Sequence, residues 1–505
     1  MDQLEDSQKD SRATMDASSK GDARVMRMGT ASVPRLVVEF AIPSVVGMVV
    51  NGSYAIVNSV FLGNAMGEVG LSAITVANPM LIVFMAFAML VGNGGNALAA
   101  LRLGEGRRYE AERALGNVVL LSIVLAVLVA LAASNPFILD WVLTVSSSTE
   151  DVRPYASIYI QILSFGFIFQ MIGMGVNNFI RTAGAPVRAL VTMVIGLVSA
   201  AIFNYFFVIL FGWGIVGSAL ASLAGQALSC VAVLWYFLGV KDAPMHLRLR
   251  CMRPDFRLMG SIFALGFPSF AMQVGMALIN FLLNYQLVKY GAMTVIGAEN
   301  ALASIGVVQR VAQFSVFPII GVATAIQPLL GYNYGARIIP RVRSTYKCGV
   351  IGATAICVLV WAFIYLFTTS IVSAFGIVND DLNEFTAFAM RVQFITLPII
   401  GFQIVSSNYF QATGQPAKSI FLSLTRQILF LIPLILFLPD LIPHIAPSLH
   451  GLDALYFAQP CADLLSTVTT VVFVIWEVRR LRRMEDEQRG CAGGGSSADA
   501  SGCGA

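Results

Sequence analysis

Residues 178–186 read NFIRTAGAP, and residues 408–416 read NYFQATGQP. The leading Asn, the Gly and the final Pro coincide in register, although the two segments lie far apart along the chain. Each segment closes a strongly apolar stretch, and a Gly followed by a Pro is typical of the point where a helix ends and turns. The recurrence predicts that a helical unit is duplicated within this chain.

Two further matches occur at nearly the same separation. Residues 41–44 (AIPS) correspond to residues 266–269 (GFPS), and residues 103–107 (LGEGR) correspond to residues 333–337 (NYGAR). Three matches indicate a duplicated unit of six helices. Because six is even, both copies would have the same orientation and be related by an axis along the membrane normal. We therefore expect a cavity between the halves and alternating access by rocking one half against the other.

The composition requires a membrane. Of the 505 residues 57% are hydrophobic and only 12% are charged, and the mean hydropathy is +0.77, which leaves too few polar residues to cover a soluble globule. A membrane-spanning helix needs roughly 20 apolar residues. The sequence predicts an all-α integral membrane protein of about twelve helices, at residues 35–62, 74–101, 113–138, 155–181, 186–211, 215–239, 258–289, 297–328, 346–370, 385–410, 418–438 and 453–478.

The distribution of charge predicts domains and topology. We expect a disordered cytoplasmic N-terminus (1–32), an N-terminal six-helix bundle (33–240), a cytoplasmic linker (241–257), a C-terminal six-helix bundle (258–480) and a disordered cytoplasmic tail (481–505). Lys and Arg gather at both termini and in the breaks after even-numbered helices, and acidic residues predominate in the other breaks. Positive loops stay inside, so both termini should be cytoplasmic in a bacterial inner membrane. Basic runs can also bind nucleic acid or lipid head groups, but orientation is their commoner role.

The chain resembles the multidrug and toxic compound extrusion (MATE) family, and within it the MepA-like bacterial subgroup. The resemblance rests on the motif of residues 178–186, on GSALAS (217–222), on IQPLLGYNYGA (326–336) and on YFQATG (409–414), and it covers roughly residues 33–480. It implies two pseudo-symmetric six-helix bundles with a central cleft. It also implies a secondary active exporter that trades cationic or amphipathic organic compounds for H⁺ or Na⁺.

Other classes of protein fit less well. The chain has no Gly-rich phosphate loop for ATP, no metal-ligand spacing and no cluster of catalytic residues, so we expect no enzyme activity, no metal and no cofactor besides the coupling ion. The alternative transporter is a lipid-linked precursor flippase on a related two-bundle fold, which would favour a strongly basic cavity. Expected partners are membrane lipids and small organic cations or amphipathic drugs, with no nucleic acid, and we expect a monomer.

The ion-coupling candidates are Glu299, Asn58, Asn204 and Glu39. The resemblance implies an Asp in helix 1 and another in helix 5, where this chain has Asn58 and Asn204. An amide cannot titrate, although it can coordinate sodium or hydrogen-bond a substrate. Glu299 is the acid best placed to bind a proton or another cation. The alternative is that Glu299 only interacts favourably with the dipole at the N-terminus of its helix. Glu39 could equally snorkel or cap at the cytoplasmic end.

Polar and charged residues inside apolar spans tend to face a cavity or a partner. Charges of this kind are Arg310, Arg391, Arg426 and Asp463, and the first two are as well explained by structural pairing as by substrate binding. Amides cluster on shared helix faces, which suggests a cavity lining, although helix–helix hydrogen bonding is the alternative. Pro43 and Pro268 are candidate hinges, but membrane helices tolerate proline. The substrate-cavity candidates are Asn51, Gln170, Asn177, Asn178, Asn280, Asn284, Gln309, Gln313, Arg310, Arg391, Gln403 and Asn408.

Overall fold

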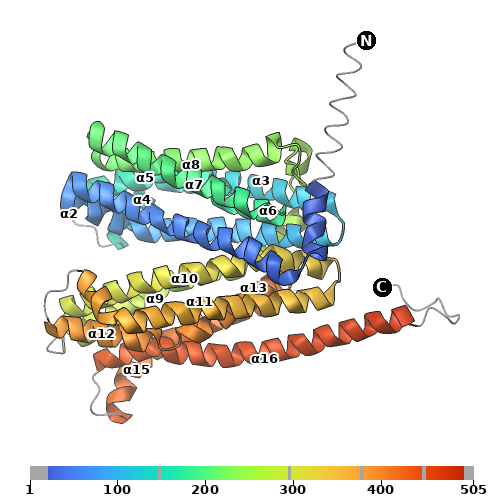
Figure 1. The fold of residues 1–505 in the computed structure, drawn as a ribbon. Coiled ribbons are helices and arrows are strands. Elements are labelled where there is room, and N and C mark those ends of the chain that lie inside the picture. Colours follow the sequence, from blue (N-terminus) through green and yellow to red (C-terminus); the bar gives the residue numbers. More distant parts are fainter. Residues whose placement is uncertain (1–20, 146–149, 294–296, 376–379, 446–450, 494–505) are drawn as a thin grey trace.

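The computed structural model describes residues 21–145, 150–293, 297–375, 380–445 and 451–493, and these are helical almost throughout. Figure 1 shows two halves side by side, α2–α8 in one and α9–α16 in the other. In the part of the chain that the structure describes, eleven helices are long and apolar enough to cross a membrane, and the bent pair α12 and α13 brings the number to twelve. The expectation of about twelve spans is confirmed.

The first half contains the following elements. Helix α2 (Val33–Gly104) holds two spans, Val33–Gly67 and Val69–Gly104, which meet at the positive-φ Gly67. The others are α3 (Arg108–Ser134), the short α4 (Pro136–Val145), α5 (Arg153–Gly175), α6 (Asn177–Thr182), α7 (Pro186–Asn204), the π-helix η1 (Tyr205–Leu210) and α8 (Gly214–Gly239). The loop expected between the first two spans is therefore reduced to a kink at Gly67.

The second half follows the 3₁₀ turn η2 (Leu249–Met252) in the linker. It contains α9 (Phe256–Gly291), α10 (Ala298–Gly335), α11 (Ile339–Ala374), α12 (Asp380–Phe394), α13 (Leu397–Ala412), α14 (Pro416–Leu424), the π-helix η3 (Thr425–Leu431), α15 (Ile432–Ile445) and α16 (Gly451–Gly493). The break between α12 and α13 bends that span by 43°. The π-helices interrupt the fifth span of the first half and the corresponding span of the second.

The two halves meet most closely where glycines allow backbones to touch. A Cβ added to Gly266 of α9 would overlap the carbonyl oxygen of Leu90 in α2, and one added to Gly94 would overlap that of Ile262. Nearer the end of α2, a Cβ on Gly104 would overlap the carbonyl of Tyr332 in α10. The reciprocal contact joins Gly335 and Leu101, so the crossing of α2 and α10 is symmetric. Small residues permit such crossings in membranes.

The correspondence of Gly104 with Gly335 corrects one of the sequence matches. Gly106 (φ 77°) and Arg337 (φ 57°) both adopt the left-handed conformation just after their helices end. The amide of Gly106 donates to Leu103 and that of Arg337 donates to Tyr334. Gly106 therefore corresponds to Arg337, and the match of residues 103–107 with 333–337 is one residue out of step. Aligning Arg107 with Arg337 was misleading, because the second copy places an Arg at the left-handed position that usually requires Gly.

The polar ends hold more structure than expected. Residues 21–30 form a helix, against the disorder expected for residues 1–32, because Met28 buries its side chain and its carbonyl accepts bonds from Asn333 and Arg341. Residues 1–20 lie outside the described residues. Helix α16 runs to Gly493, so the disorder expected from residue 481 is also wrong up to that point, where Arg343 pairs with Glu485 at 3.1 Å. Residues 494–505 lie outside the described residues.

One end of the molecule, here called the linker face, is formed by the helix of residues 21–30 and the linker of residues 241–257. Arg24 pairs with Asp242 there, and Arg113 of α3 pairs with Asp255 at 2.8 Å. Asp255 also caps α9 by accepting bonds from the amides of Arg257 and Leu258. The linker therefore ties α3 of the first half to the start of the second half.

We expect Gly266→Ala to destabilise the protein, because the new methyl group must displace the α2 backbone. Overpacking of this kind costs typically 1–3 kcal/mol. The matched control is Gly260→Ala on the same helix, where a Cβ meets nothing and the better helix propensity of Ala should be neutral or stabilising. Thermal unfolding in detergent measures both variants. A Gly266→Ala variant with the melting temperature of the control would show that the close crossing does not hold the halves.

Asp255 predicts a dependence of stability on pH. The hydrogen bond from the amide of Leu258, and after it the nearby Arg113 guanidinium, hold the pKa of Asp255 below its usual value despite some desolvation. A depressed pKa stabilises the folded state above the ordinary pKa of about 4, and that contribution is lost as the pH falls through the lowered value. We expect Asp255→Asn to flatten the acid side of a melting-temperature profile. An unchanged acid slope would contradict this role.

Candidate functional site

A chain of hydrogen-bonded side chains crosses between the halves. It starts at the fully buried Arg181 of α6, whose guanidinium donates to Asn178 Oδ1 at 2.9 Å. Asn178 donates to Asn93 Oδ1 at 2.9 Å, and Asn93 donates to Ser269 Oγ of α9 at 3.1 Å. Ser269 also accepts from Gln411 Nε2 of α13 at 3.3 Å. Arg181 and Gln411 hold the same place in the duplicated motif, so the chain joins equivalent positions of the two repeats.

A second link lies at the crossing of α2 and α10. Asn96 Nδ2 is 3.5 Å from Gln327 Oε1, and Asn96 Oδ1 accepts from Thr182 Oγ1 at 2.5 Å. The Nε2 group of Gln327 is buried without a hydrogen-bond partner. Asn96 and Gln327 correspond at the same offset that relates Gly104 to Gly335. The bundle interface therefore carries a polar layer, defined here as Asn93, Asn96, Asn178, Ser269, Gln327 and Gln411.

The polar layer can be broken at low cost. A net hydrogen bond contributes about 0.5–1.5 kcal/mol in proteins, and side-chain bonds between membrane helices average about 0.6 kcal/mol. The cross-bundle members are neutral amides and a hydroxyl, so parting them exposes no new charge. The polar layer therefore stabilises contact between the halves, and its hydrogen bonds are weak enough for the halves to separate.

A second polar cluster lies inside the first half and contains two of the predicted ion-coupling residues. Asn204 Nδ2 donates to Asn58 Oδ1 at 3.1 Å, and Asn58 Nδ2 donates to Ser222 Oγ at 2.8 Å. Tyr159 is hydrogen-bonded to Ser222 and Asn58. Asn204 is the last residue before η1, and its Oδ1 is buried without a partner. The structure brings the two Asn residues together, but the cluster contains no carboxylate that could carry a proton.

A third cluster lies inside the second half and is charged. Asp463 of α16 is fully buried, and its Oδ1 accepts from Arg426 Nε at 2.8 Å and from Gln459 Nε2 at 3.0 Å. Its Oδ2 accepts from Thr396 Oγ1 at 3.1 Å. One turn along α16, Ser466 accepts from Gln403 Nε2 at 2.8 Å. Arg426 lies in η3, and Thr396 lies in the break between α12 and α13.

The remaining ion-coupling candidates lie near helix ends. Glu39 pairs with Arg27 of the N-terminal helix at 3.2 Å, so its observed contact belongs to the linker face. Glu299 lies in the first turn of α10, and its side chain is outside the described residues. The hinge candidates Pro43 and Pro268 are buried within α2 and α9, which remain helical at both positions.

The substrate-cavity candidates are dispersed. Asn177 is buried and donates to Ala189 O and Thr192 Oγ1, and Asn408 donates to Ile404 O, so the observed bonds of these two amides stay within their own halves. Asn178 belongs to the polar layer, and Gln403 belongs to the cluster around Asp463. The candidates that the structure leaves half-buried are Asn51, Gln170, Asn280 and Gln309, and those that it leaves exposed are Asn284, Gln313, Arg310 and Arg391.

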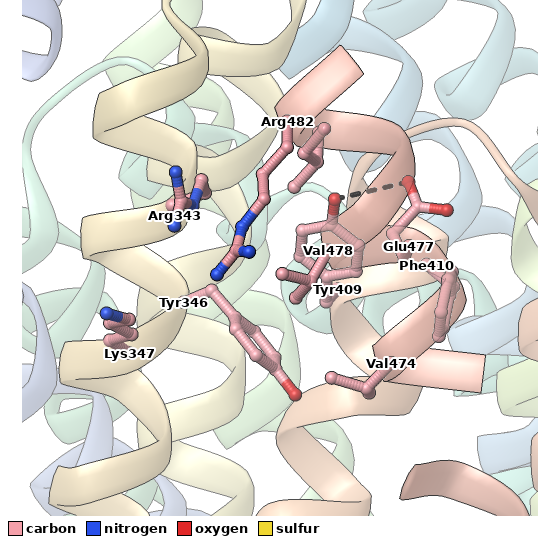
Figure 2. A pocket seen from close by; sticks show the side chains of 10 residues that line it. Arg343, Tyr346, Lys347, Tyr409, Phe410, Val474, Glu477, Val478 and Arg482 are labelled. Atoms are coloured by element: carbon pink, nitrogen blue, oxygen red, sulfur yellow. Dashed lines mark hydrogen bonds between the residues drawn. The ribbon is translucent and has the colours of Figure 1, made fainter. Parts of the chain in front are cut away.

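A cavity of about 140 Å³ lies in the second half, between α11, α13 and α16 (Figure 2). The acidic residue that lines this cavity is Glu477, which is buried and pairs with Lys418 at 2.8 Å. Gln415 and Tyr409 donate to the same carboxylate, at 2.7 Å and 3.4 Å. Arg480 also pairs with Glu477, at 3.4 Å, so this carboxylate already has two cationic partners near the start of α14.

Sequence reasoning missed most of the polar layer. Asn93, Asn96, Ser269, Gln327 and Gln411 were not among the candidates. A signal existed, because Asn93 and Asn96 flank a run of glycines and Gln411 replaces Arg181 in the repeated motif. The pairing of these residues across the halves could not be read from either helix alone.

Comparison with known proteins agrees with this architecture. The MatE family model matches residues 43–206 and 268–437. The chain belongs to the MatE family of transporters. One matched segment falls in each half, as a duplicated unit requires. The MatE assignment confirms the family resemblance, and it places the chain among transporters rather than enzymes.

Relatives of this MatE chain are similar over almost the whole length. The multidrug export protein MepA of Staphylococcus haemolyticus strain JCSC1435 is 23% identical over 462 residues, which cover 91% of this chain and 96% of the relative. A structure of the MATE multidrug transporter DinF-BH in complex with rhodamine 6G is 31% identical, with a TM-score of 0.80 over 90% of this chain and 97% of that one. An outward-facing MATE transporter of the MOP superfamily, at 21% identity, has a TM-score of 0.81 over 91% and 98% of the two chains and supports the fold.

We expect Asn93 and Ser269 to be energetically coupled. A double-mutant cycle of Asn93→Ala and Ser269→Ala should give a coupling energy of about 0.5–1.5 kcal/mol, because each substitution removes the same cross-bundle bond. Unfolding in detergent measures the four proteins. Ser261→Ala is the matched control, since Ser261 of α9 donates only to the backbone of Arg257. Strict additivity of Asn93→Ala and Ser269→Ala would argue against the observed contact.

Proposed function

We propose that this MatE transporter exports cationic or amphipathic organic compounds from a bacterial cytoplasm in exchange for H⁺ or Na⁺. The observation that carries the proposal is the interface of the two repeats, where a polar layer and close glycine contacts join the halves by weak, separable interactions. Transporters of this type alternate access by moving one repeat against the other. The compounds are inferred from the relatives, which are named multidrug export proteins or bind rhodamine 6G.

The proposed orientation places the linker face in the cytoplasm. Arginines concentrate there and pair with acids of the N-terminal helix and linker, as Arg108 does with Asp22 and Arg188 does with Asp242. Excess positive charge marks the cytoplasmic side of a membrane protein. The bacterial inner membrane, with both termini inside, is therefore the proposed location. Because the halves touch near this face, the structure corresponds to a state closed toward the cytoplasm in this orientation.

The proposed contributions of individual residues differ between the clusters. Asn58 and Asn204 would act through their amide oxygens, on a cation or on substrate, because neither can release a proton. Asn51, Gln170, Asn280 and Gln309 remain proposed contacts for substrate. Glu299 remains a proposed ion-binding acid at the start of α10.

Efflux of rhodamine 6G or ethidium from a pump-deficient bacterial host tests the exporter. We expect the wild type to lower dye retention below that of the empty host. Separate collapse of the proton and sodium gradients should abolish this difference in one case, which names the coupling ion. Asn58→Ala should reduce efflux several-fold, because it breaks the link between Ser222 and Asn204. Ser53→Ala is the matched control, since its hydroxyl only donates to Val49 O of the same helix.

Two outcomes would count against the exporter. Dye retention equal to that of the empty host under every gradient would remove organic cations from the proposal and favour a flippase or a narrower exporter. Efflux that survives collapse of both gradients would remove ion coupling.

A further inference from the structure

The acids buried in the described part of the chain are Glu112, Asp463 and Glu477. Glu112 accepts from the amide of His246 in the linker, and Glu477 pairs with Lys418 in the first turn of α14, so both lie toward the linker face. Asp463 differs because it lies inside a span. It is twelve residues into α16, about 18 Å along a helix, and the hydrocarbon core is about 30 Å thick.

The partner of Asp463 lies at a similar depth. Arg426 is ten residues beyond Pro416, about 15 Å from the linker-face end of its span. The exposed fraction of the side chain is 1% for Asp463 and 19% for Arg426. The carboxylate is thus enclosed, while the guanidinium retains some accessible surface at the same depth.

Two irregular backbone segments converge on this pair. Arg426 projects from the π-helix η3, and Thr396 lies at the 43° break between α12 and α13. Such interruptions leave backbone groups without their usual partners and are uncommon in membranes unless they line a cavity or a functional site. Both irregularities place a hydrogen-bond donor on the carboxylate of Asp463.

The stability of the fold does not explain why a buried ion pair is present at this depth. Burying two charges costs several kcal/mol per ion, and well-packed apolar residues of similar volume are often as stable or more so. Charged residues within membrane spans mark ion pathways and proton relays. A pair that can exist as carboxylate with guanidinium, or as neutral acid with a released guanidinium, provides two states that a proton can select.

The surroundings favour a proton over sodium. A sodium ion would need several oxygen ligands and would lie beside the Arg426 guanidinium, which already occupies Oδ1 at 2.8 Å and repels a cation. A proton needs no coordination shell, since it forms a single O–H bond to one carboxylate oxygen.

Several ionisable groups on the surrounding elements make no ion pair or hydrogen bond with Asp463. Arg391 of α12 is exposed, Asp440 of α15 accepts from Tyr290 of α9, and Lys418 of α14 binds Glu477. Tyr409 of α13 faces Glu477, and Tyr365 of α11 donates to the carbonyl of Arg391. Arg426 is thus the charged group in contact with Asp463.

We propose that Asp463 is the proton-binding carboxylate that couples transport, and that Arg426 is the cation displaced when the proton binds. A proton delivered by water bonds to the carboxylate, the ion pair with Arg426 opens, and the guanidinium becomes available to the interior of the second half. Return of Arg426 to the carboxylate expels the proton on the opposite side. The inference rests on the proposed exporter and locates its coupling chemistry in the second half.

Purified protein in liposomes tests the proposal with rhodamine 6G as the probe. Three quantities are measured: dye binding, counterflow exchange without an ion gradient, and uptake driven by a pH gradient. We expect Asp463→Asn to retain binding and counterflow and to lose pH-driven uptake to the level of empty liposomes. In weakly buffered detergent, dye binding should release protons from the wild type and not from Asp463→Asn. Thr467→Ala is the matched control, because its hydroxyl contacts only the backbone of residue 463.

A second variant covers the case in which Asp463→Asn fails to fold around an unpaired Arg426. Asp463→Leu combined with Arg426→Met removes both charges at similar volume and should fold, again with counterflow and without pH-driven uptake. Normal pH-driven uptake by either folded variant would overturn the proposal, as would a wild type that responds to a sodium gradient alone. A wild type that neither binds nor exchanges the dye would instead reject the exporter itself.

Discussion

The close approach of helix backbones at the bundle interface is the constraint on which the rest of the structure depends. Glycines in α2, α9 and α10 let carbonyl groups of the opposite half occupy the space where a side chain would stand. In lipid there is little hydrophobic driving force between helices, so packing at short distance supplies the attraction. That approach in turn brings Asn93 within reach of Ser269 and Asn96 within reach of Gln327. The polar layer exists because the backbones can come so close.

The interface combines tight steric fit with weak chemistry. The glycine contacts leave no space for an added side-chain atom. The hydrogen bonds beside them join neutral groups, and each contributes little free energy. Such an interface specifies a single closed arrangement without making it permanent. The helix of residues 21–30 adds contacts on the same side, because Asn333 and Arg341 of the second half both donate to the carbonyl of Met28. Closure at the linker face is therefore shared between the two repeats and the segment before them.

The two halves share a backbone plan and differ in their interior chemistry. Each has a π-helix in its fifth span, and each uses that irregularity to bring a polar side chain into the bundle. In the first half the result is the amide cluster of Asn58 and Asn204. In the second half it is the ion pair of Asp463 and Arg426. The shared backbone plan therefore surrounds an amide cluster in the first half and a buried ion pair in the second half.

The sequence alone determined the class, the approximate spans, the duplication and the family, because apolar length and repeated Gly–Pro turns are local properties of the chain. It also named Asn58 and Asn204 together, and it noted Arg426 and Asp463 as separate charges. Only the tertiary structure decided that Arg426 meets Asp463, that Asn93 crosses to Ser269, and that Glu39 is engaged by Arg27. These pairings depend on how distant helices rotate and cross, and a one-residue error in the repeat near Arg337 shows that spacing alone cannot fix such contacts.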